Sequence, residues 1–418
     1  MTPSTILKIF VAIFTLLILI TIDYPVYKNI KDNVLHNKKR LFTIFKILYW
    51  TISGTSYSML IIYSITRPYK IPADYSEIFI IINSIVFITF FFKIIVFLSI
   101  MIKCLVSLIM RVFKLNKTII EKTKRTIVIL GTSIADLIFI ILFYNLFFSG
   151  QDIVIKRVEI NLPDLPKSFD NYKIIQISDL HAGSYLNNKI IEDAVSIINK
   201  ENADMIAFTG DIVNFQSSEM NEYLPYLKRF KSKDGVFAVM GNHDYGEYVS
   251  WDTYKEKQDD VRNIIRNYNK ISWNILLNEN RIIRKGDDSI AIIGSENWSN
   301  SKRFKSPGDL KKAKKGVEDV GFKILLSHDP QHFELKVIKE NKDIQLTLSG
   351  HTHAMQFGID NKYIKWSPSK WAYKYWNGLY KEGHQYIYVN RGLGYVGFAS
   401  RIGMLPEITV ITLKKSSQ

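Results

Sequence analysis

Asp, Asn and His recur in five short groups, and each group directly follows a short apolar run. In chain order the groups are Ser178-Asp179-Leu180-His181, Gly210-Asp211, Gly241-Asn242-His243-Asp244, Ser327-His328 and Gly350-His351-Thr352-His353. Together they supply carboxylate oxygen and imidazole nitrogen, a mixture that suits Mn, Fe or Zn and is too rich in nitrogen for Ca or Mg alone. The pattern therefore predicts a metal centre.

Each group has an ordinary structural explanation when it is considered alone. Gly-Asp is a turn signal, Asn or Asp at a strand end commonly makes a turn or a helix cap, and a single His is usually a core or surface residue. Five of the eight histidines nevertheless fall in these groups, and His36, His332 and His384 lie outside them. Ordinary turns would not keep selecting metal-ligand residue types, so we favour the joint interpretation.

The spacing within the groups indicates how the side chains converge. Asp179 and His181 are two residues apart, as are His351 and His353, and in an extended segment such pairs point to the same side. Glycines beside the second, third and fifth groups permit tight turns and a close approach of the backbone to a ligand.

The elements that must position these groups follow from hydrophobic periodicity. After Gly150, short apolar runs alternate with amphipathic segments, which predicts an α/β fold. Ligands bind outside the carboxyl ends of the strands in open α/β sheets. The expected strands are Val154–Ile160, Lys173–Ile177, Met205–Thr209, Val236–Met240, Ser289–Ile293, Lys323–Leu326, Ile344–Leu348, Tyr386–Val389 and Glu407–Thr412. The expected helices are Asn188–Lys200, Glu219–Phe230, Trp251–Tyr268 and Gln331–Lys339.

The first third of the chain has a different pattern. Four apolar stretches each approach the ~20 residues that a helix needs to cross a bilayer: Ile6–Ile22, Ile47–Thr66, Ile78–Ile102 and Thr126–Phe148. A cleavable signal peptide is the alternative for the first stretch, but no small-x-small cleavage site follows it. Lys93 and Asp136 lie in the third and fourth stretches, where a charge is costly unless it faces other helices or reaches the interface. We therefore expect residues 1–150 to form a transmembrane helical domain and residues 151–418 a separate domain.

Charge distribution predicts an orientation and argues against one class of partner. The loops after the first and third stretches are rich in Lys and Arg, so the positive-inside rule places them in the cytoplasm. With four spans, the C-terminal domain of this inner or cell membrane protein is then extracytoplasmic, and an interfacial stretch would reverse that side. Residues 1–150 carry +11 of the net charge of +16, which leaves +5 for the rest and weakens a nucleic-acid interpretation. The single cysteine, Cys104, excludes an intrachain disulfide and a Cys-based zinc site.

In this order and spacing, the five groups resemble the calcineurin-like metallophosphoesterase family, whose pattern is Asp-x-His, Gly-Asp, Gly-Asn-His-Asp/Glu, a single His and Gly-His-x-His. The resemblance extends from about Val154 to Thr412. The segments Asn390-Arg391-Gly392-Leu393-Gly394 and Leu405-Pro406-Glu407-Ile408 look like its membrane-tethered bacterial branch, some of whose enzymes act on phospholipid-like and sugar-nucleotide lipid substrates. Ala354-Met355 stands where many members have two glycines, so we expect substrate access beside His353 to differ. The family fold is a four-layer α/β/β/α sandwich.

The resemblance also implies roles for the matching residues. Asp179, His181, Asp211 and His353 would hold one metal ion, and Asp211, Asn242, His328 and His351 would hold the other, with Asp211 as the bridge. A hydroxide between the two metals would attack phosphorus in line. His243 would protonate the leaving oxygen or stabilise its charge, and Asp244 would orient His243. The two ions would be Mn, Fe or Zn.

The sequence thus predicts a membrane-anchored hydrolase of phosphate mono- or diesters, with a lipid-linked or cell-envelope substrate and no nucleic-acid partner. A transporter or receptor with an inactive phosphoesterase fold is one rival, and a nuclease or nucleotide phosphatase is another. Tyr245–Tyr254 and Asn297–Gly308 are candidate caps over the site. Tyr363–Lys381, which interleaves aromatic residues with lysines, is either a lipid-headgroup surface or a packed loop over the sheet. Lys302–Lys315 is either a solvated loop or a surface that docks on anionic lipid.

Overall fold

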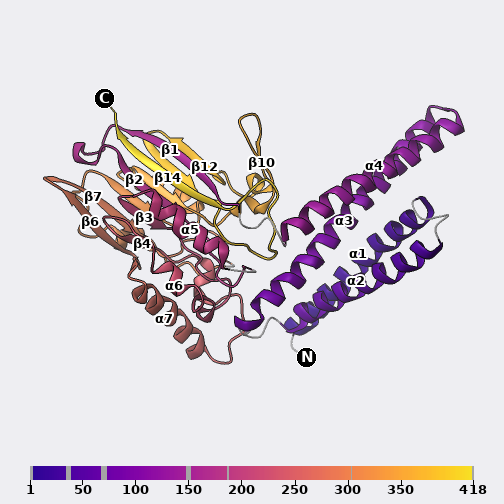
Figure 1. Cartoon of the computed structure of the whole chain (residues 1–418), viewed down its shortest axis with the longest axis horizontal. Helices are drawn as coiled ribbons and strands as arrows, with labels where there is room; N and C mark the ends of the chain where they lie inside the picture. Colours follow the sequence, from indigo (N-terminus) through magenta and orange to yellow (C-terminus); the bar gives the residue numbers. More distant parts are fainter. Residues whose placement is uncertain are drawn as a thin grey trace. The chain divides into compact units, whose positions relative to one another are not determined.

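The computed structural model describes residues 3–33, 39–66, 73–146, 152–185, 188–302 and 304–416 (Figure 1). The chain divides into two compact units, Met1–Tyr69 with Ile81–Phe147 and Lys70–Ile80 with Phe148–Gln418. The expected domain boundary at residues 150 and 151 falls outside the described residues.

The first unit is helical. Its helices are α1 (Pro3–Asn33), α2 (Lys39–Thr66), α3 (Ala73–Val112) and α4 (Lys117–Tyr144). Among the described residues, three helical segments are long and apolar enough to cross a membrane: Ala12–Asp32, Ile80–Val112 and Lys117–Tyr144. They correspond to the first, third and fourth expected stretches. The second expected stretch lies within α2, which is not among these three.

A buried ion pair joins three helices of this unit. Lys93 Nζ on α3 lies 2.8 Å from Asp23 Oδ1 on α1, and both side chains are buried. From α2, the Tyr49 hydroxyl donates to the same Asp23 oxygen at 2.6 Å, and the Ser53 hydroxyl oxygen accepts from Lys93 at 2.7 Å. Lys93 therefore faces the other helices, which is one of the two arrangements expected for a charge in this stretch. Asp136, by contrast, lies on an exposed side of α4.

The second unit contains two six-stranded sheets. The first has the order β1-β14-β2-β3-β4-β5, and the second has the order β12-β13-β9-β8-β7-β6. The first comprises β1 (Val154–Leu162), β14 (Glu407–Lys415), β2 (Tyr172–Ile177), β3 (Met205–Phe208), β4 (Val236–Ala238) and β5 (Asn274–Ile275). The second comprises β12 (Gly378–Glu382), β13 (Gln385–Val389), β9 (Leu346–Ser349), β8 (Lys323–Leu326), β7 (Asp288–Gly294) and β6 (Glu279–Lys285).

The two sheets pack face to face over one apolar core. Ile174 on β2 and Ile411 on β14 contribute to it from the first sheet, and Ile324 on β8 and Leu348 on β9 contribute from the second. All four side chains are fully buried. Alternate residues of these strands face this core, because the side chains of a strand point to its two faces in turn.

Helices cover the outer faces of the sheets. Helix α5 (Lys189–Lys200) buries one apolar side, and Tyr268 of α7 (Tyr254–Lys270) packs against Phe208 of the first sheet. A second apolar cluster joins the outer face of the second sheet to α8 (Leu310–Ala313) and the helical turn η5 (Phe333–Val337). The predicted four-layer α/β/β/α architecture is therefore confirmed.

All nine expected strands are present, and the differences are additional short or edge strands and one divided helix. The edge strands β6 and β12 were not expected, because their charged and exposed residues mask the apolar alternation. The edge strand β5 and the paired segments Ile359–Asp360 and Lys365–Trp366 were also not expected, since each is only two residues long. The expected helix Glu219–Phe230 is divided into η3 (Ser217–Met220) and α6 (Leu224–Leu227). Pro225 lies in the first turn of α6, where proline is tolerated at a helix start but not in a helix interior.

We expect Ile324→Ala, at the centre of the core between the sheets, to lower the free energy of unfolding by about 2–5 kcal/mol, because it leaves a cavity. The measurement is urea unfolding of the full chain in detergent, monitored by tryptophan fluorescence. Ile282→Ala removes the same atoms from an exposed position on β6 and should change the free energy by only about 0.5 kcal/mol. Equal losses in the two variants would contradict the packing described above.

Candidate metal centre

The five polar groups follow five strands at one edge of the sandwich. Strands β2, β3 and β4 are parallel neighbours in the first sheet, and β8 and β9 are parallel neighbours in the second. Each strand ends just before one group, so the structure brings together all of the predicted site residues except Asp244, whose carboxylate points into the backbone behind the site. The signal that located them was the polar residue type at a strand's carboxyl end.

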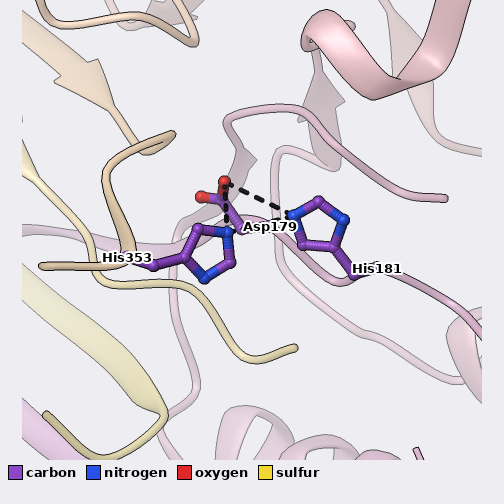
Figure 2. Close-up of side chains that lie close together, drawn as sticks. All are labelled: Asp179, His181 and His353. Carbon is purple, nitrogen blue, oxygen red and sulfur yellow. Dashed lines mark hydrogen bonds and ion pairs between the residues drawn. The ribbon is translucent and has the colours of Figure 1, made fainter. Parts of the chain in front are cut away.

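One cluster contains Asp179, His181 and His353 (Figure 2). His353 Nε2 lies 3.2 Å from Asp179 Oδ1 and 3.0 Å from His181 Nε2. His181 Nε2 is 3.9 Å from Asp179 Oδ1. All three side chains are buried, and the nitrogen and oxygen atoms that could bind a metal face a common point.

A second cluster contains Asp211, His328 and His351. His328 Nε2 lies 3.1 Å from Asp211 Oδ2 and 3.2 Å from His351 Nδ1. The Asn242 side-chain oxygen lies 3.1 Å from His328 Nε2. Asp211 Oδ2 is also 3.7 Å from His181 Nε2, so this carboxylate lies between the two clusters.

The chemistry of the second cluster fits a cation. The Nδ1–H of His328 donates to the Thr209 carbonyl oxygen at 2.8 Å, which leaves a lone pair on Nε2. That nitrogen faces the acceptor atoms of Asp211 and Asn242, and such acceptors repel one another unless a positive charge lies among them. Ligands bound to one ion at about 2.1 Å are themselves about 3 Å apart, as these atoms are. The residues therefore fit a metal ion with mixed nitrogen and oxygen ligands.

Charge effects at the site lead to the same conclusion. Burial lowers the pKa of His181 and of His353, which keeps both imidazoles in the neutral form that binds metals. At His328, burial lowers the pKa, but the charge and hydrogen bond of Asp211 and the charge of Asp179 together outweigh burial and raise the pKa to about 10. Burial would raise the pKa of Asp211, yet the charges of His328 and His243 hold it well below its usual value. The site thus attracts positive charge.

The backbone of the site is strained. Asp179, His181, Asp211, His351 and His353 all have positive φ angles, between 45° and 73°. Such conformations cost about 1–3 kcal/mol each and gather at functional sites. The prediction that Asp179 and His181 point to the same side of an extended segment is therefore wrong. Tight left-handed turns make their side chains converge instead.

Close packing explains the glycines of two groups. A Cβ atom on Gly241 would lie 2.2 Å from Asp211 Oδ1, and one on Gly350 would lie 2.2 Å from Asp179 Oδ2. Ala354 and Met355, which replace the glycines of the resembled family, both have φ of 48°. A side chain is unfavourable at that φ, so these residues keep a glycine-like backbone at a cost.

His243 lies beside the two clusters, and its ring is held by a residue that was not expected. Its Nδ1–H donates to the Asn214 carbonyl oxygen at 2.7 Å. Asp244, expected to orient this ring, instead accepts peptide N–H groups from Asp211, Ile212, Val213 and Gly241 at 2.9–3.3 Å. Asp244 therefore fixes the backbone that carries Asp211, and the expected contact with the His243 ring is corrected. A carbonyl partner leaves no sequence signal, because every residue has one.

Three aromatic residues line the site from separate loops. Tyr248 stacks on His243 with a centroid distance of 3.9 Å, and its hydroxyl oxygen accepts from Asn242 Nδ2 at 2.6 Å. Tyr373 places its hydroxyl 2.9 Å from His351 Nε2, and Phe304 packs edge-on against the same imidazole. Tyr248 and Phe304 come from the two segments expected to cap the site.

We expect Tyr248→Phe to weaken metal binding by about 10–100-fold. The variant keeps the ring on His243 but loses the hydroxyl that directs the Asn242 side-chain oxygen towards the metal. Titration of the metal-free full chain with Mn²⁺ by calorimetry measures the effect, with Tyr254→Phe at an exposed position as the control. Unchanged affinity would show that other contacts fix the amide.

Glu219 supports the loop that holds His243. Its carboxylate accepts the peptide N–H groups of Asn214 and Phe215 at 2.7 and 3.1 Å. Burial raises the pKa of Glu219 from its ordinary value of 4.5 to about 8.

This shift predicts a pH dependence of stability. The folded state binds the Glu219 proton more tightly than the unfolded chain does, so the contribution is complete below the ordinary pKa and is lost as the pH rises towards 8. The free energy of unfolding should therefore fall between about pH 5 and pH 8 by more in the wild type than in Glu219→Gln, which carries no ionisable group there. Urea unfolding in EDTA measures the difference, and the exposed Glu192→Gln should behave as the wild type. Parallel curves for wild type and Glu219→Gln would refute the assignment.

Known proteins provide an independent comparison. A sequence model of the calcineurin-like phosphoesterase domain matches residues 172–355. A Danio rerio transmembrane protein with metallophosphoesterase domain is 30% identical over 65% of this chain and 60% of its own length. An uncharacterized metallophosphoesterase from Helicobacter pylori is 32% identical over 63% of this chain and 65% of its own length, so the chain spans less than two thirds of both relatives.

The Bacillus subtilis protein YkuE, an uncharacterized metallophosphoesterase, is 30% identical over 60% of this chain and 82% of its own length. The domain model covers all five polar groups of the site. The chain belongs to the calcineurin-like metallophosphoesterase family.

Proposed function

We propose that this chain hydrolyses phosphate mono- or diesters with two metal ions, each an ion of Mn, Fe or Zn. The observation that carries the proposal is the position of Asp211, whose carboxylate lies between two buried clusters of metal-ligand side chains. Two cations close together require a shared negative ligand to offset their repulsion, and Asp211 is suited to that role.

The residues of each cluster then have defined tasks. Asp179, His181 and His353 hold one ion, and Asn242, His328 and His351 hold the other. When bound, the ions supply Lewis acidity towards the phosphate oxygens and an activated water. The hydrogen bond from His328 to Thr209 keeps its Nε2 available as a ligand.

His243 is the proton donor of the proposed reaction. Its Nδ1–H is directed to the Asn214 carbonyl oxygen, which turns the Nε2 edge of the ring away from that loop. The ring lies edge-on to His181, with centroids 4.8 Å apart, and so stands beside the first cluster. This position suits protonation of a leaving alkoxide, a step that needs a donor within hydrogen-bond reach of the departing oxygen.

We further propose that the helical unit anchors the enzyme in the inner or cell membrane, that α2 crosses the membrane together with the three segments of sufficient apolar length, and that the phosphoesterase domain therefore lies on the extracytoplasmic side. Among the described residues, three helical segments have the necessary apolar length, and the Danio rerio relative bears the name of a transmembrane protein. Anchoring favours a lipid-linked or cell-envelope substrate, because such a substrate diffuses in the same membrane.

We expect the purified full chain, loaded with Mn²⁺ or Zn²⁺, to release p-nitrophenol from p-nitrophenyl phosphate or from its bis ester. Asp211→Asn should reduce this activity to background, since the shared negative charge is lost. His243→Ala should reduce it by about 10²–10⁴-fold, the usual contribution of a general acid. The ratio of rates on the two esters identifies the ester class.

Asp287→Asn and His384→Ala make the same chemical changes at exposed positions and should retain full activity. The proposal fails if the metal-loaded wild type hydrolyses neither ester faster than Asp211→Asn. Such a result would favour the rival in which the fold only binds a ligand.

A further inference from the structure

Exposed apolar residues gather on the hairpin formed by β10 (Ile359–Asp360) and β11 (Lys365–Trp366) and on the helical turn η7 (Pro368–Trp371). The hairpin projects from the phosphoesterase domain (Figure 1). Tyr363 is 80% exposed and Trp371 is 73% exposed, and both are large aromatic side chains. We call the following set the hairpin surface: Ile359, Lys362, Tyr363, Ile364, Lys370 and Trp371.

The structure divides the aromatic and basic segment Tyr363–Lys381 into two parts. In its second half, Tyr375 is 2% exposed and packs against Phe333, and Trp376 is 6% exposed and packs with Ala354 and Met404. The packed-loop interpretation is therefore correct for this half. It does not account for the first half, where Tyr363 and Trp371 face outward.

The hairpin surface is held in place by contacts beneath it. Trp366 packs edge-on against Phe357 on one side and Trp371 on the other, with centroids 6.0 and 5.9 Å away. The Asn361 side-chain oxygen accepts the peptide N–H groups of Tyr363 and Ile364, both at 2.9 Å. The exposed aromatic residues are thus presented by an ordered turn.

The charge of this surface is positive. Residues 359–374 contain four lysines and one acidic residue, Asp360. The Asp360 carboxylate lies 3.1 Å from Lys156 and 3.5 Å from Arg391, so cations outside the segment already balance it. Lys374 pairs with Glu382 at 2.8 Å, whereas Lys362 and Lys370 are exposed beside the aromatic residues.

We propose that the hairpin surface contacts the headgroup layer of an anionic bilayer. Tyr and Trp favour this layer because their rings are amphipathic, and lysines are attracted to its anionic lipids. A protein partner is disfavoured, since lysine is depleted in the cores of protein interfaces. The inference rests on the proposed membrane anchoring, which supplies a bilayer next to the domain.

The contact would bring headgroups close to the metal centre. Trp371 is two residues from Tyr373, whose hydroxyl lies 2.9 Å from His351 Nε2. Two residues span at most about 7 Å. Lipid-borne phosphates would therefore be presented beside the candidate metal ligands, a consequence that rests on the proposed hydrolysis as well.

The test places a fluorescent label on the hairpin of the full chain. Cys104→Ser removes the only native cysteine, and Ile364→Cys then accepts an NBD label while Tyr363 and Trp371 remain. The protein is placed in nanodiscs of phosphatidylcholine, with or without phosphatidylglycerol, that contain lipids with nitroxide-labelled headgroups. The matched control is Ile282→Cys, another exposed isoleucine of the same domain, on β6.

We expect headgroup nitroxides to quench the label at position 364 several-fold more than the label at position 282, with stronger quenching when phosphatidylglycerol is present. In the double variant Lys362→Glu/Lys370→Glu, the label at position 364 should no longer be quenched more than the label at position 282. Lys200→Glu/Lys228→Glu makes an equal change of charge elsewhere and should retain the stronger quenching at position 364. Equal quenching at the two positions would overturn the proposal. So would a label that is shielded from iodide but not quenched by lipid, because a protein surface would then cover the hairpin.

The same samples separate this inference from the proposals on which it depends. Retention of the chain in the discs during flotation tests the anchoring, and a chain that is not retained overturns both the anchoring and the bilayer contact. Hydrolysis of p-nitrophenyl esters in the same discs tests the enzyme independently of either.

Discussion

The properties of the site depend on the repulsion among hydrogen-bond acceptor atoms that the fold buries close together. Asp179 and Asp211 are buried carboxylates, and the imidazole nitrogens of four histidines lie among them. Uncompensated charge of this kind is costly in a protein interior, so the arrangement is favourable only with positive charge at its centre. A metal ion bound among these side chains would stabilise the folded state that assembles them, which would couple metal binding to folding.

The two-sheet core supplies the rigidity that holds these atoms together. Five strands end at one edge of the sandwich, and their apolar residues interdigitate between the sheets. The turns after the strands adopt left-handed conformations that a flexible loop would not retain. Asp244 adds four peptide hydrogen bonds, which fix the backbone that carries Asp211.

In both units of the chain, several buried polar side chains have hydrogen-bonding partners. In the helical unit, the buried pair of Lys93 and Asp23 is completed by hydroxyl groups from a third helix. In the phosphoesterase domain, Glu219 and Asp244 are completed by peptide N–H groups. In each case a buried polar group is retained because other groups satisfy its hydrogen-bonding capacity, and removal of one partner would leave the rest with the full cost of burial.

The sequence alone determined the residue types of the site, their order, and the strands that carry them. A short apolar run and the polar residues after it are local features, so the α/β class and the candidate ligands could be predicted from them. Only the tertiary structure decided which groups contact the side chains of the site: Asn214 behind His243, Tyr248 on Asn242 and Tyr373 on His351. It also decided that Trp376 is packed while Trp371 is exposed, although both stand in one aromatic segment. The physical reason is that hydrogen bonds, strain and burial depend on contacts between distant parts of the chain, and such contacts leave no local pattern.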